Sequence, residues 1–123
     1  MKAILIDSVE RTVRSVEVDG SLDSLYASLS SQPQYNVELV DRVVVDDNNL
    51  VWVDDEGLLK EPQHFFIWKG TERTVPLAGL GLVLGTTEDG ESCDTTLTVE
   101  EVRSQIDFAD IREVRARAQA GEF

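Results

Sequence analysis

The chain contains one histidine, His64, and one cysteine, Cys93, the side chains best suited to nucleophilic chemistry. A thiol nucleophile needs a base to take its proton, and the base usually needs a third group to orient it. Cys93 lies in an acidic segment, residues 91–94, where negative neighbours disfavour the thiolate. We therefore expect no enzyme activity from this pair and, with so few soft ligands, no zinc site.

Acidic residues gather in three short segments, at positions 46–47, 54–56 and 88–91. Carboxylate oxygens are ligands for hard cations such as Ca²⁺. The EF-hand spacing is absent, because neither Gly57 nor Gly90 has an aspartate five residues before it. Adjacent acids in turns are usually solvated, so we expect no bound metal and no other cofactor.

Residues 79–85 are rich in glycine. The dinucleotide-binding fingerprint needs a different spacing and a helix that begins at the glycines, whereas a strand-like run follows Gly81. We interpret these glycines as places of close approach beside a buried strand. A small-molecule pocket beside this strand is the alternative, and an anionic ligand there requires local bases from the set Arg11, Arg14, Lys60 and Arg73.

The most unusual feature of the sequence is its excess of acidic residues: 24 acidic and 11 basic residues give a net charge of −13. Such a field repels nucleic acid and anionic membranes, and it favours basic partners. Solubility alone is the simpler explanation of the same acidity. No segment is long enough to span a membrane, the apolar run at residues 3–6 is too short for a signal peptide, and we expect a cytoplasmic protein.

The elements that position these groups follow from turns and periodicity. Residues 3–6 and 12–18 predict one hairpin, and residues 37–45 and 50–53 predict a second. Ser21 opens a helix whose apolar stripe includes Leu25 and Leu29, and Thr98 with Glu101 forms a capping box before a second stripe of Val99, Val102 and Ile106. Further strands are expected at residues 65–68 and 82–84.

The expected fold is therefore α+β: an antiparallel sheet of two hairpins plus further strands, with one or two helices packed on it. One α+β domain occupies residues 1–111, and residues 112–123 form a C-terminal tail that is helical or flexible. The predicted core consists of Leu25, Leu29, Val51, Val53, Phe66 and Leu84.

Three segments carry a resemblance to a known family: residues 1–7 (MKAILID), 53–60 (VDDEGLLK), and 76–85, in which PLAG leads to GLVLG. In this order they resemble small acidic proteins of unknown function found on phages, plasmids and conjugative elements. The resemblance spans roughly residues 1–110. It implies a mobile-element setting, in which antirestriction proteins are common, and it assigns no functional residues.

We expect a non-enzymatic acidic protein of a phage or plasmid that inhibits a basic host protein, one that handles nucleic acid or acts in defence, by occupying its basic surface in the host cytoplasm. A protein that binds a nucleotide or metabolite is the alternative, and a hydrolase that uses Cys93 or a carboxylate-bound metal is the least favoured class. The expected contact residues flank the strand at residues 50–53 and are Asp46, Asp47, Asp54, Asp55 and Glu56.

Overall fold

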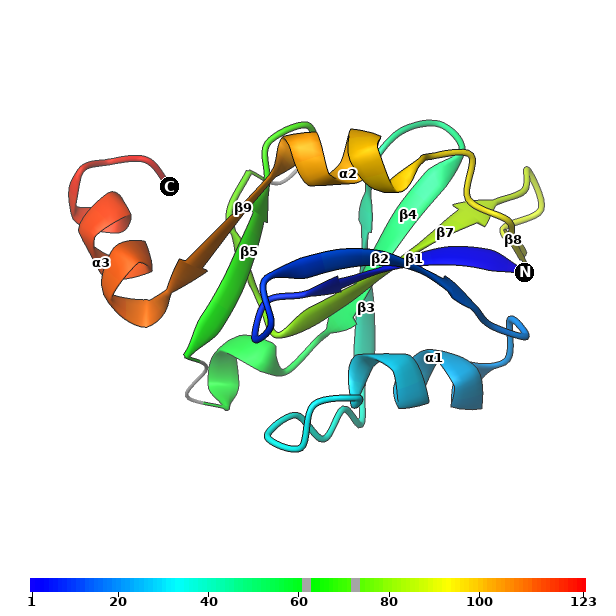
Figure 1. Ribbon diagram of the computed structural model, residues 1–123, viewed down its shortest axis with the longest axis horizontal. Helices are drawn as coiled ribbons and strands as arrows, with labels where there is room; N and C mark the ends of the chain where they lie inside the picture. Colours follow the sequence, from blue (N-terminus) through cyan, green and yellow to red (C-terminus); the bar gives the residue numbers. More distant parts are fainter. Residues whose placement is uncertain (61–62, 72–73) are drawn as a thin grey trace.

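Two antiparallel sheets and three α-helices make up the described part of the computed structural model, residues 1–60, 63–71 and 74–123 (Figure 1). The elements are β1 (Lys2–Asp7), β2 (Thr12–Glu17), α1 (Leu22–Leu29), β3 (Val40–Val44), β4 (Asn49–Asp54), the 3-10 helix η1 (Gly57–Leu59), β5 (His64–Trp68), β6 (Pro76–Ala78), β7 (Leu80–Thr86), β8 (Ser92–Cys93), α2 (Val99–Gln105), β9 (Ile106–Asp110) and α3 (Ile111–Gln119). The predicted α+β class is confirmed.

The larger sheet has the strand order β2-β1-β7-β4-β3, with β8 paired to β7. The two predicted hairpins, β1–β2 and β3–β4, are both present, and β7 lies between them. Val83 of β7 is opposite Ile4 on one side and Val51 on the other. Because β7 pairs with both β1 and β4, the two hairpins belong to one continuous sheet.

Close packing explains the glycines of β7. A Cβ atom on Gly81 would lie 2.6 Å from Cζ of Phe66, and one on Gly85 would lie 2.2 Å from the backbone oxygen of Asp94. Both distances are too short for any side chain, so another sheet or loop approaches the strand directly at these points. The interpretation of close approach beside a buried strand is confirmed, and the strand includes both glycines rather than residues 82–84 alone.

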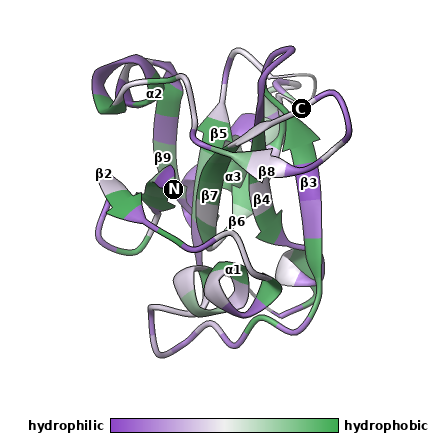
Figure 2. Ribbon diagram, turned by 90° about the vertical axis from the view of Figure 1, so that its right-hand side faces the viewer, coloured by the Kyte–Doolittle hydropathy of each residue, from purple (hydrophilic) through white to green (hydrophobic). Residues whose placement is uncertain are grey.

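The larger sheet buries a core on each face. One core lies between this sheet, the smaller sheet and α2, and it contains Phe66 and Val102. The other lies under α1 and contains Leu25, Leu29 and Leu84. The six residues predicted for the core are all buried, the most exposed being Leu25 at 7%. Figure 2 shows hydrophobic residues concentrated mainly in the strands, with hydrophilic residues in the connecting turns.

The second predicted helix ends earlier than the apolar stripe indicated. Thr98 and Glu101 form the expected capping box, and Val102 is buried. Ile106 instead begins β9, which pairs with β5 in the smaller sheet of order β6-β5-β9. Pairing of Ile106 with Trp68 satisfies the backbone of β9, and this tertiary contact overrides a short helical pattern.

The C-terminal tail is helical and is a separate helix, because β9 lies between α2 and α3. Asp110 caps it: its carboxylate accepts a hydrogen bond from the Glu113 amide, and the Glu113 side chain accepts one from the Asp110 amide. In Figure 1, α3 lies at one end of the long axis, and the N-terminus and β8 lie at the other. Among the described helices, none is long and apolar enough to cross a membrane.

Candidate functional site

Two acidic turns lie side by side at the β8 end of the larger sheet. The amide of Thr86 donates to the carbonyl of Asn48 at 2.8 Å, and Asn49 is opposite Gly85 across β4 and β7. The β3–β4 turn therefore adjoins the β7–β8 turn. We call the five acids of these turns the acidic end: Asp46, Asp47, Glu88, Asp89 and Glu91.

The segments that carry these acids contain no basic residue of their own. Residues 45–49 and 86–101 contain no lysine or arginine, and the second of these segments adds Asp94, Glu100 and Glu101. Asp94 accepts a hydrogen bond from the backbone amide of Lys2, which places this carboxylate beside the start of β1, where Lys2 is the nearby basic residue. The acids of the acidic end are all exposed. Their charges therefore act outward into solvent.

The buried side chain of Asn49 fixes the β3–β4 turn. Its Nδ2 donates to a carboxylate oxygen of Asp46 at 3.0 Å and to Oγ1 of Thr96 at 2.8 Å. Its Oδ1 accepts from Oγ1 of Thr95 at 2.6 Å and from the Thr96 amide at 3.2 Å. Asp46 also accepts from the amide of Asn48. The turn is thus held to the segment before α2, and the acidic end has a rigid base.

The other three predicted contact residues lie at the opposite end of β4. The strand has six residues and spans roughly 16 Å at about 3.3 Å per residue. Asp54 is only 8% exposed, and its Oδ2 lies 2.8 Å from Nζ of Lys60. Asp55 is exposed and Glu56 is half-buried. The structure thus brings Asp46 and Asp47 together with acids of the β7–β8 turn, and it engages Asp54 in an internal ion pair.

His64 and Cys93 are far apart. The carbonyl of His64 accepts from the amide of Gly79, whereas Cys93 is opposite Gly85. These two points are separated by six residues of extended chain, roughly 20 Å at about 3.3 Å per residue. The thiol and the imidazole therefore cannot act as a nucleophile and its base. Within residues 1–60, 63–71 and 74–123, no three His, Cys, Asp or Glu side chains are grouped to hold a metal ion.

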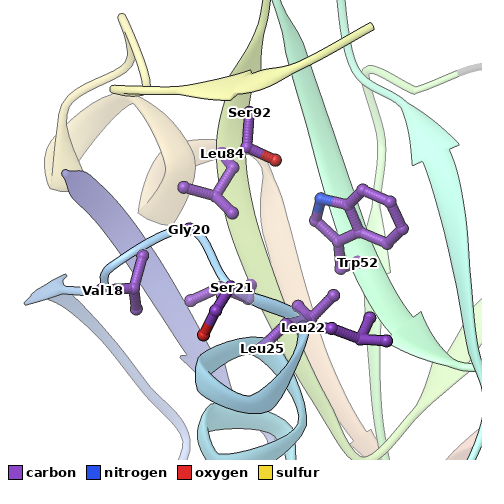
Figure 3. A pocket seen from close by; sticks show the side chains of 9 residues that line it. Val18, Gly20, Ser21, Leu22, Leu25, Trp52, Leu84 and Ser92 are labelled. Atoms are coloured by element: carbon purple, nitrogen blue, oxygen red, sulfur yellow. The ribbon is translucent and has the colours of Figure 1, made fainter.

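A hollow of about 220 Å³ lies between the start of α1, β8 and one face of the larger sheet (Figure 3). Leu82 and Leu84 of the glycine-rich strand line it, as the pocket alternative expects. The half-buried Trp52 forms another wall, and the Arg42 guanidinium lies 5.9 Å from the centre of its ring. The remaining lining residues are Val18, Gly20, Ser21, Leu22, Leu25 and Ser92.

This hollow is mainly apolar, with Ser21 and Ser92 as its polar residues, and it has no basic lining residue in the described chain. The bases that an anionic ligand requires lie elsewhere or, for Arg73, outside the described residues. Lys60 is paired with Asp54, and Arg11 is paired with Glu113. The hydroxyl of Ser21 already caps α1 by accepting from the Ser24 amide. The geometry fits a small uncharged molecule better than a nucleotide.

Among the described residues, Asp19, Tyr35 and Asp110 have clearly shifted pKa values, each with a structural cause. Burial raises the pKa of Tyr35, whose ring packs against Gly79. Hydrogen bonds from Ser21 lower the pKa of Asp19, and the Glu113 amide lowers the pKa of Asp110. Two of these groups are at helix starts. None belongs to the acidic end.

Comparison with known proteins gives one match. A family model described as a domain of unknown function (DUF3846) matches residues 1–107, which include every described strand except the end of β9. No curated protein and no solved structure matches the chain. The matched segment ends before α3. Because it covers most of the sequence, the chain belongs to the DUF3846 domain family, whose function is unknown.

Proposed function

We propose that this chain is a non-enzymatic binding protein of a phage or plasmid, and that its acidic end occupies the basic groove of a host protein that handles nucleic acid or acts in defence. The observation that supports the proposal is the union of two turns from separate hairpins into one exposed acidic surface. The two segments that form it contain no lysine or arginine. A surface of this kind attracts the same basic residues that bind phosphates.

Rigidity adds to this argument. Ordering a flexible acidic loop against a partner costs conformational entropy. Here Asn49 already orders the β3–β4 turn, and hydrogen bonds between Thr87 and Glu91 order the β7–β8 turn. A preordered array of carboxylates can therefore compete with nucleic acid for a basic groove. The resemblance to proteins of mobile elements supports a host enzyme as the target.

The test is competition for a partner isolated from host lysate, identified, and purified. A short duplex DNA or RNA should displace the protein from this partner, because both ligands need the same bases. The variant Glu88→Gln/Asp89→Asn should bind more weakly by about 0.4–2 kcal/mol, since each exposed ion pair contributes about 0.2–1 kcal/mol. That loss corresponds to roughly 2- to 30-fold in Kd.

A matched control removes the same number of charges elsewhere. Glu10 and Glu38 are exposed and lie at the opposite end of the larger sheet, beyond Asp7 of β1 and before β3. Glu10→Gln/Glu38→Gln should leave the affinity within twofold of the parent. Equal losses in the two variants would assign the effect to net charge and contradict a role for the acidic end. A stable ternary complex with the duplex would contradict the shared groove.

The hollow of Figure 3 favours a second candidate function, the binding of a small uncharged metabolite. Trp52 reports on this site because it forms one wall of the hollow and is only half-buried. A ligand there should change the fluorescence of the parent and have no effect on a Trp52→Phe variant, in which the buried Trp68 is the remaining tryptophan. A change that persists in the variant would place the ligand elsewhere.

A further inference from the structure

Helix α3 fully buries none of its side chains against the rest of the described chain. It has nine residues, none of them buried, and helices shorter than about 12–15 residues are marginal in isolation. It contacts β9 and β5, and Glu113 is ion-paired with Arg11 at 3.1 Å. Its half-buried apolar residues, Ile111 and Val114, lie three positions apart and therefore on one face. This face borders an open groove.

The groove lies between α3, β5, β6 and η1 and encloses about 710 Å³. Among the described residues its apolar lining consists of Leu58, Phe65, Val75, Pro76, Ile111 and Val114, and we call it the α3 groove. Leu58 is 67% exposed and its neighbour Leu59 is 82% exposed. Large apolar side chains exposed together beside a groove are typical of a binding surface.

A basic residue lines the α3 groove on one side, and an acidic residue lies in a hollow that adjoins its other side. Arg115 lines it on the helix side. On the η1 side, an adjoining hollow shares Leu58 and Pro76 with the groove and is lined by Asp55. A surface with an apolar groove, a basic residue on one side and an acidic residue beyond the other side can pair with a second copy of itself about a two-fold axis.

The charge of the whole molecule favours the same arrangement. Residues 111–123 contain three arginines and two glutamates, whereas residues 1–110 contain eight basic and twenty-two acidic residues. The positive segment is thus the C-terminal one, and it lies at the opposite end of the long axis from β8 (Figure 1). Two copies joined through α3 would bring positive helices to negative bodies and keep the two acidic ends far apart.

We propose that a second copy of this chain occupies the α3 groove in a two-fold symmetric dimer. Val114 of each copy packs on the apolar floor of the other groove, and Arg115 of each copy faces Asp55 of the other. The dimer covers Leu58 and the apolar face of α3. It is independent of the acidic end, so a failed partner assay and a failed dimer assay are separate results.

Sedimentation equilibrium of the full chain over a hundredfold range of concentration tests this proposal. The parent should show a monomer–dimer equilibrium. Arg115→Glu and Asp55→Arg should each weaken the dimer by about tenfold or more, because each creates two like-charge contacts. An equimolar mixture of these two variants should restore the dimer, since both contacts then join opposite charges.

Two further variants test whether the dimer depends on the α3 groove or only on surface charge in general. Val114→Asp should produce monomers with an unchanged circular dichroism spectrum, because Val114 is not part of the core. Arg14→Glu, a charge reversal at an exposed residue of β2, should leave the dimer intact. A parent that stays monomeric throughout would overturn the proposal. A dimer unaffected by both groove charge reversals, or a mixture of those variants that stays monomeric, would overturn it equally.

Discussion

Asn49→Ala should be the most costly polar substitution near the acidic end. The side chain is fully buried, and its Nδ2 donates to both carboxylate oxygens of Asp46 and to Thr96, while its Oδ1 accepts from Thr95 and Thr96. With the bifurcated contact to Asp46 taken as one, it forms four hydrogen bonds. A net contribution of about 1 kcal/mol for each hydrogen bond gives an upper figure of roughly 4 kcal/mol. Water entering the vacated space can satisfy some partners, so we expect a loss of about 2–4 kcal/mol in the free energy of unfolding.

Urea denaturation of the parent and the variant measures this loss. Asn48→Ala is the matched control, because Asn48 is exposed in the same turn and contributes its backbone carbonyl, which the substitution keeps. We expect the control to change stability by less than about 0.5 kcal/mol. Equal effects at the two positions, or a loss below about 1 kcal/mol for Asn49→Ala, would refute the view that Asn49 anchors the turn.

Phe66→Ala should cost about 2–5 kcal/mol in urea denaturation, because the ring is fully buried and packs against Gly81; a loss near zero would show that the core is misassigned. Cys93→Ser and His64→Ala should both leave inhibition of the partner intact. Loss of inhibition in either variant, with the fold preserved, would contradict the proposal that the protein is not an enzyme. Lowering the pH should fray α3, because the pKa of Asp110 is lower in the folded state than in the unfolded chain. The Asp110 carboxylate therefore stabilises the helix fully at pH values above the unfolded-state pKa. This stabilisation is lost as the pH falls through the folded-state pKa. Circular dichroism should show this acid transition in the parent and not in Asp110→Asn, whose cap does not titrate.

Local patterns in the sequence predicted much of the fold. Ser21 and Thr98 are capping residues that act within one turn of chain, and both cap the expected helices. The hairpins also have short connections, so their turns and alternating residues specify them. Leu25 and Phe66 are large apolar side chains in such elements, and both are buried as predicted.

The features that were missed depend on contacts between distant segments. Strand β9 is a short segment of mixed apolar and acidic residues without strict alternation, and its extended form depends on pairing with β5, about 40 residues earlier in the chain. The insertion of β7 between the hairpins brings residues 46–49 beside residues 86–91, which no local pattern specifies. The burial of Asp54 likewise depends on Lys60, which reaches back from the end of η1.

The most direct test of the proposed function is the salt dependence of Kd for the purified complex with the host partner. Exposed charges are screened beyond about 10 Å at 0.1 M ionic strength, so an interface built on the acidic end weakens steeply with added salt. We predict that log Kd rises with log salt concentration for the parent and for Glu10→Gln/Glu38→Gln. The slope should be clearly shallower for Glu88→Gln/Asp89→Asn. A parent affinity that does not change with salt would contradict the proposal.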